Sequence, residues 1–318
     1  MRRERSGQSA LVLAVAVVIT VVLLFTTNWS GHSDKSAARD PSPTASSTAP
    51  STSHSSASHS SRPKPSATPT LSAAQRRAAA TAKVAALDKG LPSGSVSVAA
   101  LNMKTGSSYS WGSTSGMWTA SVYKLFVLET LLIDHGGPLT GTQADEAVPM
   151  IENSDNTAGY ELFLAAGGRS GLLASVGKLG LKHTVPGHAD PAFTITSAMD
   201  MITLLKNLVT SSSPLTAASR SYALNLMEKV ESDQRWGVGV IADKGTDFAN
   251  KNGWLSIDNS NGPGEDDNGL WAVNSVGVVR VKGQQVLMAV MTRHRPDFDS
   301  GVDLVQDLAR AIEPAVAA

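Results

Sequence analysis

Apolar positions along the chain fall into three regimes. Residues 10–25 are almost continuously apolar, with Thr20 as the one polar residue. Residues 41–70 contain no large apolar side chain, and from residue 73 onward short apolar runs alternate with polar turns. Each regime predicts a different kind of structure: a membrane-directed segment, a linker and a folded domain.

The first regime is typical of a membrane anchor. Three arginines precede it and a tryptophan follows. A helix of about 18 residues spans roughly 27 Å, close to the thickness of the hydrocarbon core of a bilayer. The positive flank should stay in the cytoplasm, which places the rest of the chain outside. We therefore expect residues 1–30 to be a single-pass anchor in the cell membrane. The alternative is a signal peptide cleaved near Ser36-Ala37-Ala38, which would release a secreted protein.

Residues 31–72 have the composition of a tether. Between positions 41 and 70 there are 11 Ser, 5 Thr and 6 Pro. Such a segment cannot bury enough apolar surface to offset the entropy lost on ordering. About 40 residues of random coil span roughly 35 Å. The sequence therefore predicts an exported domain that a disordered linker holds at a distance from the membrane.

The third regime, residues 73–318, predicts one folded domain. The expected elements are, in chain order, a helix at 73–89, strands at 95–101 and 108–111, a largely buried helix at 121–134, a helical and loop-rich middle at 140–230, strands at 247–257, 270–281 and 285–292, and a final helix at 299–313. Two strands before the helical middle and three after it predict an α/β (α+β) fold. In that fold an antiparallel five-stranded sheet is flanked by the terminal helices and carries an inserted helical subdomain.

Composition narrows the possible functions. The chain has no cysteine, which excludes a disulfide scaffold, a thiolate metal site and a cysteine nucleophile. Its 27 basic residues are balanced by 27 acidic ones, so there is no basic excess of the kind that nucleic-acid binding requires. We expect no nucleic-acid partner, no metal, no cofactor and a monomeric protein.

Three short motifs carry candidate chemistry. Ser121 and Lys124 stand three residues apart at the start of the predicted buried helix, so the hydroxyl and the amine can meet on one helix face. A buried lysine loses proton affinity and can then act as a base for the serine. The second motif is Ser154-Asp155-Asn156, and the third is Lys251-Asn252-Gly253 in a predicted strand. Together they predict a nucleophilic serine site.

This set, in this order, resembles the S-x-x-K, S-D-N and K-T-G motifs of class A β-lactamases and penicillin-binding proteins. The resemblance covers residues 73–318 and implies a β-lactamase/transpeptidase-like fold. It implies that Ser121 is the acylated nucleophile, Lys124 its base and Ser154 the relay of a proton to the leaving nitrogen. Lys251 completes the catalytic set by attracting the substrate carboxylate. The implied substrate-binding residues are Asn156, Asn252 and Gly253.

The third motif departs from the family pattern. Asn252 stands where the family has Thr or Ser, and its reach differs from that of a hydroxyl. A literal K-T-G occurs at residues 104–106, but it precedes Ser121 and falls in a predicted hairpin turn. We therefore assign the family motif to 251–253.

A second departure concerns the loop glutamate that activates the deacylating water in class A β-lactamases. Between Glu161 and Asp190 the chain has no acidic residue. The candidate bases in or near this stretch are His183, His188 and Asp190, with Glu152 the next one to consider. The sequence therefore predicts slow deacylation.

Taken together, these features predict an exported, membrane-tethered serine hydrolase. It would act through an acyl-enzyme on a small-molecule β-lactam or on a D-Ala-type stem peptide of peptidoglycan. The alternative is a penicillin- or peptidoglycan-binding or sensing domain that keeps the fold and does not hydrolyse its ligand.

Overall fold

The structure, a computed structural model, describes residues 71–258 and 267–317. The predicted anchor, and the linker up to residue 70, lie outside these residues. Among the helices within the described ranges, none is both long enough and apolar enough to cross a bilayer.

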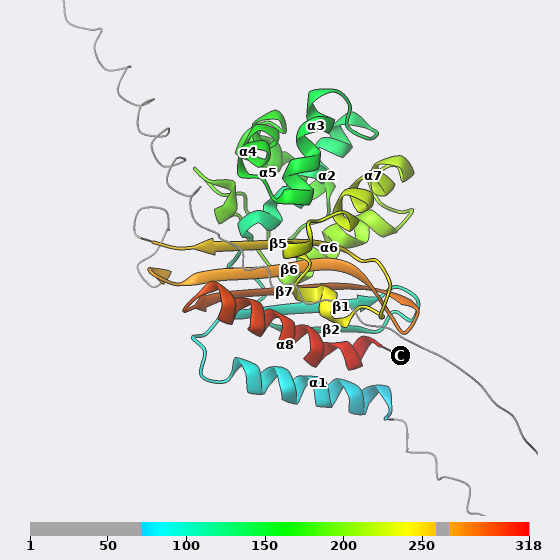
Figure 1. Cartoon of the computed structure of the whole chain (residues 1–318), viewed down its shortest axis with the longest axis vertical. Helices are drawn as coiled ribbons and strands as arrows, with labels where there is room; N and C mark the ends of the chain where they lie inside the picture. The colour runs from blue at the N-terminus through cyan, green and yellow to red at the C-terminus, as the bar shows by residue number, and fades with distance from the viewer. Residues whose placement is uncertain (1–70, 259–266, 318) are drawn as a thin grey trace, which may run out of the picture. The chain divides into compact units, whose positions relative to one another are not determined.

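The centre of the domain is the predicted five-stranded antiparallel sheet (Figure 1). Its strands are β1 (Val96–Asn102), β2 (Ser108–Gly112), β5 (Ala249–Ser256), β6 (Trp271–Val281) and β7 (Gln284–Arg295). Their order is β2-β1-β7-β6-β5, and every neighbouring pair is antiparallel. This confirms the predicted fold class and leaves β5, which carries the Lys251 motif, at one edge.

The strands at the centre of the sheet are apolar on both faces, because both faces are covered. Successive side chains of a strand point to opposite faces. Along β7, Val286, Met288 and Val290 therefore join one hydrophobic core, whereas Leu287, Ala289 and Met291 join another. Near-continuous apolar runs of this kind are expected when helices lie on both sides of a sheet.

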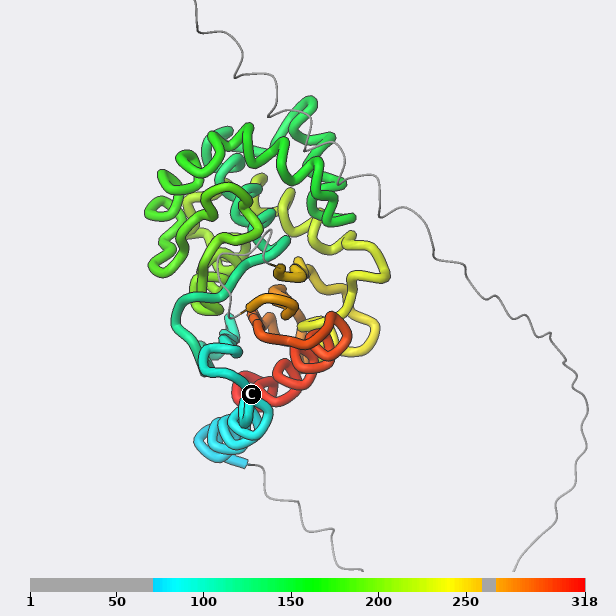
Figure 2. Tube along the Cα trace, turned by 90° about the vertical axis from the view of Figure 1, so that its left-hand side faces the viewer, coloured from blue at the N-terminus to red at the C-terminus, as the bar shows by residue number. Residues whose placement is uncertain are grey.

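Helices cover the sheet in two groups. The described α-helices are α1 (Ala73–Asp88), α2 (Tyr123–His135), α3 (Thr142–Val148), α4 (Asn156–Ala165), α5 (Gly168–Lys178), α6 (Ala198–Val209), α7 (Ala217–Glu228) and α8 (Phe298–Val316). Helix α8 packs on β6 and β7, and α1 packs against α8. Helix α6 contacts β7 and β1, and α2 to α7 form the inserted helical layer (Figure 1 and Figure 2).

Local sequence signals set several element boundaries. Ser72 and Gln75 form a reciprocal capping box at the start of α1. The connection between the strands predicted at 270–281 and 285–292 is one residue shorter in the structure, because Gln284 already pairs with Val281. The two turn residues, Lys282 and Gly283, have φ of 49° and 73°, the combination that tight antiparallel hairpins favour.

The buried helix starts two residues later than predicted. Helix α2 begins at Tyr123, and residues before it form the short 3₁₀ turn η1 (Ala120–Val122). The sequence analysis also missed a second, two-stranded sheet of β3 (Met117–Trp118) and β4 (Ile195–Thr196). Both differences matter for function, because β3 leads directly into the turn that carries Ser121.

Candidate active site

The Ser121 turn is strained. Ala120, directly before the serine, has a φ of 45°, in the left-handed region that non-glycine residues rarely adopt. Such a conformation costs about 1–3 kcal/mol and persists only when the surroundings hold it. Ser121 is partly exposed, whereas Lys124 on the first turn of α2 is buried. The fold thus presents a hydroxyl at the surface and hides its prospective base underneath.

Lys124 brings the first two motifs together. Its Nζ lies 3.1 Å from Ser121 Oγ, which confirms the predicted proximity. The same nitrogen donates to the backbone oxygen of Ser154 at 2.6 Å and to Asn156 Oδ1 at 2.8 Å. A neutral amine has two hydrogens and one lone pair. If the two hydrogens occupy these oxygens, the lone pair is left to accept the proton of Ser121.

Burial also prepares Lys124 electrostatically. Desolvation lowers its pKa from 10.5 to about 8, although the charges of Asp155 and Asp190 act in the opposite direction. At pH 7 about a tenth of the side chain is therefore the free amine, the form that can act as a general base, and about half is at pH 8.

Lys251 reaches the same point from the sheet. Its Nζ donates to Ser154 Oγ at 2.7 Å and to the backbone oxygen of Asn252 at 2.9 Å. Burial, followed by the nearby charge of Lys124, holds the pKa of Lys251 well below its usual value. Lys124 Nζ lies 3.4 Å from Ser154 Oγ as well, so the hydroxyl of Ser154 links the two amines.

Ser154 owes its position to local backbone geometry. It ends the one-turn π-helix η2 (Pro149–Asn153) in the left-handed conformation, with φ of 57°. The next residue, Asp155, caps α4 by accepting the backbone amide of Ala158 at 2.8 Å. The S-D-N motif is therefore both a helix start and part of the polar cluster.

Gly253 has a role that the sequence analysis did not foresee. A Cβ at this position would lie 2.7 Å from the backbone oxygen of Thr119 and 2.9 Å from the backbone nitrogen of Ser121. Strand β5 therefore packs backbone to backbone against the nucleophile turn, and only glycine allows that approach. We predicted that Gly253 binds a substrate, but the space beside it is occupied by the backbone of η1.

Asn252 does not join the cluster. Its neighbours in β5, Lys251 and Gly253, face η1 and Ser154, so strand alternation turns Asn252 to the opposite face. There its side chain is fully buried and its amide donates to the backbone oxygens of Gln234 at 2.7 Å and Trp236 at 3.2 Å. The predicted contact between Asn252 and a substrate would require the side chain to leave these partners.

Sequence reasoning overlooked Gly159 of α4. A Cβ on this residue would lie 2.6 Å from Lys124 Cε and 2.8 Å from the hydroxyl of Tyr123. Its missing side chain makes room for the catalytic amine. A glycine inside a predicted helix, five residues after Ser154, was the available signal.

The candidate bases for deacylation are placed as follows. Asp190 starts the turn η3 (Pro191–Phe193), and its Oδ1 accepts the backbone amide of Ala192 at 2.8 Å. Its charge opposes the lowering of the pKa of Lys124, and it adds to desolvation in raising the pKa of the buried Tyr123. His183 and His188 are exposed, and Glu152 is partly buried in η2. Of the four candidates, Asp190 is the one whose charge acts on Lys124.

Within residues 71–258 and 267–317 no group of three His, Asp or Glu side chains has the arrangement of a metal site. The polar cluster is built instead from two amines and two hydroxyls on rigid elements.

A partly exposed serine within hydrogen-bond reach of a buried lysine, on this sheet and helical layer, is the arrangement of a serine hydrolase of the β-lactamase type. A family model described as the beta-lactamase enzyme family matches residues 140–315, more than half of the chain. The chain belongs to this family. Among curated proteins, none matches it.

Solved structures share the fold over nearly their whole length. A point mutant of PBP-A, an acyl-enzyme complex with penicillin G, is 21% identical with a TM-score of 0.62, covering 75% of this chain and 96% of its own. The TLA-3 extended-spectrum β-lactamase is 16% identical with a TM-score of 0.61, covering 74% and 98%. A β-lactamase from Chitinophaga pinensis is 15% identical with a TM-score of 0.61, covering 74% and 97%. At these identities the likeness shows the fold.

Proposed function

We propose that this protein is a serine hydrolase that forms an acyl-enzyme on Ser121 with β-lactams or D-Ala-type cell-wall peptides and deacylates slowly. The observation that carries the proposal is the contact of 3.1 Å between Ser121 Oγ and the buried amine of Lys124. It supplies what a serine nucleophile needs, a base within hydrogen-bond reach whose pKa lies near neutrality.

Acylation follows from this geometry. Lys124 Nζ accepts the proton of Ser121, and Oγ forms a bond to the carbonyl carbon of the substrate. Backbone amides at the start of the buried helix stabilise the negative oxygen that develops. When the carbon–nitrogen bond breaks, the hydroxyl of Ser154 donates its proton to the leaving nitrogen. Lys124, 3.4 Å from Ser154 Oγ, returns the proton it took from Ser121.

Substrate preference follows from charge. The two buried amines face the hydroxyl of Ser154, and a substrate carboxylate near Lys251 would offset their mutual repulsion. Asn156, exposed at the mouth of the cluster, has an amide group that can bond the substrate amide. A carboxylate next to a cleavable amide is common to penicillins and to D-Ala-terminated peptides.

Deacylation needs a second base with access to a water molecule. Asp190 is the candidate we favour, since its charge reaches Lys124. Asp190 is exposed, and its Oδ1 is already engaged with the backbone amide of Ala192. General-base help is worth about 10²–10⁴-fold, so the acyl-enzyme should be long-lived.

The proposal extends to location. The arginine-rich start and the apolar run of residues 10–25 favour a membrane-tethered domain outside the cell. Fractionation of cells with protease digestion from outside tests this. Mature protein that begins near residue 39 and appears in the medium would refute the anchor.

The full-length chain incubated with a fluorescent penicillin tests the chemistry. We expect a stoichiometric adduct on wild-type protein by intact mass, no adduct on Ser121→Ala, and slow release of product from a chromogenic cephalosporin. Asp190→Asn should prolong the adduct further, and His183→Ala should not. Rapid multiple turnover that none of these loop variants affects would show that the water is activated elsewhere, with Glu152 next to test.

One observation favours the non-hydrolytic alternative. The side chain of Asn252 is buried away from Ser121, so the third motif presents no side-chain donor beside Lys251. Reversible binding of penicillin without any mass increase on Ser121 would establish a binding or sensing domain.

A further inference from the structure

The nucleophile turn is held from the sheet by a residue outside the three motifs. Asn274 in β6 is the register partner of Gly253 in β5 and is fully buried. Paired residues of neighbouring strands present their side chains to the same face, so Asn274 fills the space beside the glycine. Its amide nitrogen donates to the backbone oxygens of Trp118 at 2.8 Å and Thr119 at 3.1 Å.

These two oxygens belong to the peptide groups that lead into the strained residue. Thr119 O also accepts the backbone amide of Val122 at 3.1 Å, closing the turn around Ala120 and Ser121. Orienting these carbonyls fixes the peptide planes on the N-terminal side of Ala120, where the chain adopts its left-handed φ of 45°. The other atom of the side-chain amide, Asn274 Oδ1, accepts the backbone amide of Thr292 at 3.1 Å, so Asn274 also binds β7.

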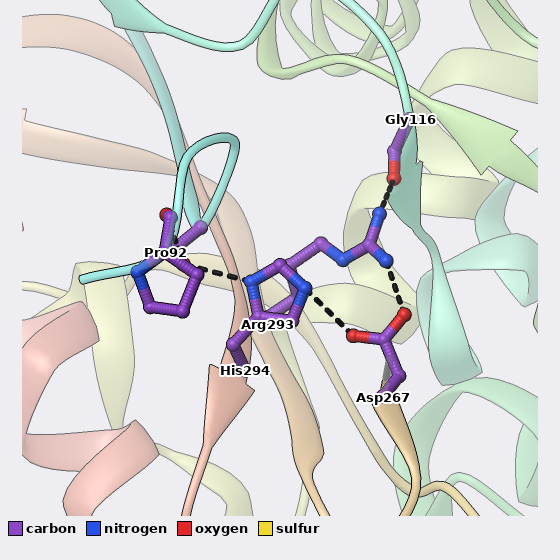
Figure 3. A network of polar contacts seen from close by, with 6 residues as sticks. Pro92, Gly116, Asp267, Arg293 and His294 are labelled. Carbon is purple, nitrogen blue, oxygen red and sulfur yellow. Dashed lines mark hydrogen bonds and ion pairs between the residues drawn. The ribbon is translucent and has the colours of Figure 1, made fainter. Parts of the chain in front are cut away.

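A second brace acts on the same lead-in strand (Figure 3). Arg293, at the end of β7, donates from Nη1 to the backbone oxygen of Gly116 at 2.9 Å. Its guanidinium lies 4.6 Å from the ring centre of Trp118, a cation–π distance. Asp267 contacts the other end of the guanidinium and keeps it in place. The segment before Ser121 is thus held in two places. Asn274 of β6 binds the carbonyls of Trp118 and Thr119, and Arg293 of β7 binds the carbonyl of Gly116.

We propose that Asn274 is a positioning residue for the nucleophile: its side-chain amide holds the carbonyls of Trp118 and Thr119, and thereby keeps Ser121 within reach of Lys124. It touches neither substrate nor reacting atoms and acts through the backbone of the turn. The acylation part of this proposal rests on the function proposed above, and the positioning part does not.

Asn274→Asp is the most selective variant. It keeps the volume and the acceptor for Thr292, but it replaces the donating amide by an oxygen that faces two carbonyls. Thr292→Val is the matched control. It removes an equally buried bond, from Thr292 Oγ1 to the backbone oxygen of Val273 at 2.6 Å, and leaves the nucleophile turn untouched.

The first measurement is hydrogen–deuterium exchange of the full-length protein over residues 117–126, which needs no substrate. We expect Asn274→Asp to lose protection in this segment and Thr292→Val to retain it. Equal protection in both variants would overturn the proposal.

The second measurement is the rate of Ser121 acylation by a fluorescent penicillin as a function of its concentration. Misplacement of a reacting group by about 1 Å can cost 10²-fold in rate. We expect a fall of that order in the limiting rate for Asn274→Asp, with little change in the half-saturating concentration, and wild-type behaviour for Thr292→Val. Wild-type acylation by Asn274→Asp, or an equal loss in the control, would overturn the proposal.

If wild-type protein forms no adduct, the proposed function fails while the exchange measurement still decides the role of Asn274. Should Asn274→Asp not fold, Asn274→Ser replaces it, because it also removes the amide without adding a charge. The same outcomes then support or overturn the proposal.

Discussion

The Lys124–Lys251 pair and the Asp267–Arg293–His294 network both place ionisable groups out of solvent, but they balance charge differently. At the pair, two amines converge on Ser154 and face hydroxyl, carbonyl and amide oxygens. In the network, one buried carboxylate lies between a guanidinium and an imidazole, in contact with Arg293 Nη2 and 2.8 Å from His294 Nε2.

His294 completes the network (Figure 3). Its Nδ1 lies 2.8 Å from Ser95 Oγ, whose single hydrogen goes to the backbone oxygen of Pro92 at 2.6 Å. Nδ1 therefore donates to Ser95, while Nε2 lies 2.8 Å from Asp267 Oδ1. The imidazole is thus held between a hydroxyl and a carboxylate.

Burial has a different effect on the lysine pair and on the Asp267–Arg293–His294 network. Desolvation together with a like charge lowers the proton affinity of both amines in the pair. In the network a carboxylate contacts a guanidinium and an imidazole, so the side chains have a fixed geometry and brace the structure.

Replacing the catalytic amine should give the largest effect. Lys124→Met removes the base from Ser121, and we expect the acylation rate to fall by about 10²–10⁴-fold. Thermal stability should hold or rise, because a well-packed apolar side chain replaces a desolvated amine. The control is Lys178→Met, which removes an exposed lysine that pairs with Asp134 at 3.4 Å. Undiminished adduct formation in Lys124→Met would end the assignment of the base.

The pH dependence of acylation should report the same amine. The free amine is the active form and the pKa of Lys124 is about 8, so the rate should rise roughly ten-fold per pH unit below 8 and level off above it. Stability should change with the same sign. Because the folded-state pKa is lowered from 10.5, the unfolded chain binds the extra proton between pH 8 and 10.5. The free energy of unfolding attributable to Lys124 therefore rises across that window. A rate profile that is flat from pH 6 to 9 would contradict this.

Breaking the charge-balanced network should affect stability more than chemistry. Asp267→Asn leaves Arg293 and His294 without their carboxylate. Loss of one partner of a buried ion pair costs about 3–5 kcal/mol, and the partial exposure of Arg293 puts our expectation at the lower end. Asp307→Asn is the control, since its exposed pair with Arg310 is worth at most about 1 kcal/mol. Urea unfolding measures both. Equal stability of the two variants would show that the network is not a brace.

Glu129 is a third kind of buried ionisable group, an acid that forms no ion pair with a cation in the described part of the chain. It is fully buried in α2, and Asn207 Nδ2 donates to its Oε2 at 3.2 Å. Burial raises its pKa well above the usual value, although the bond from Asn207 opposes the shift. The folded state therefore holds a proton that the unfolded state releases above about pH 4.5, so this residue lowers stability as pH rises.

Glu129→Gln should remove that dependence. We expect a modest stabilisation at pH 8, little difference near pH 4, and unchanged acylation. Chemical denaturation at the two pH values measures it. A variant that is less stable at pH 8 than wild type would mean that the carboxylate has a partner in the core that glutamine cannot satisfy.

Much of the fold could be predicted from the sequence because its signals are local. The alternation of β1, the apolar runs of β6 and β7 and the capping Ser72 are readable from neighbouring residues, and the five-stranded antiparallel sheet followed from the sequence of elements. The order of the strands in the sheet was not predicted. The short sheet of β3 and β4 was missed because a two-residue strand has no periodicity to detect.

The candidate site divides in the same way. The spacing of Ser121 and Lys124 and the order of the motifs determined which side chains could meet, and the structure brings Ser121, Lys124, Ser154, Asn156 and Lys251 together. The packing of the fold determines three further features of the site. Asn252 points away from Ser121, Gly253 lets β5 approach the nucleophile turn, and Asn274 donates to the backbone that leads into it. These depend on which faces of β5 and β6 meet which backbone. The contacts of Gly253 and Asn274 with the nucleophile turn join segments more than a hundred residues apart, which no local pattern encodes. The low proton affinity of the two lysines has the same origin, because it comes from the solvent that the assembled fold excludes.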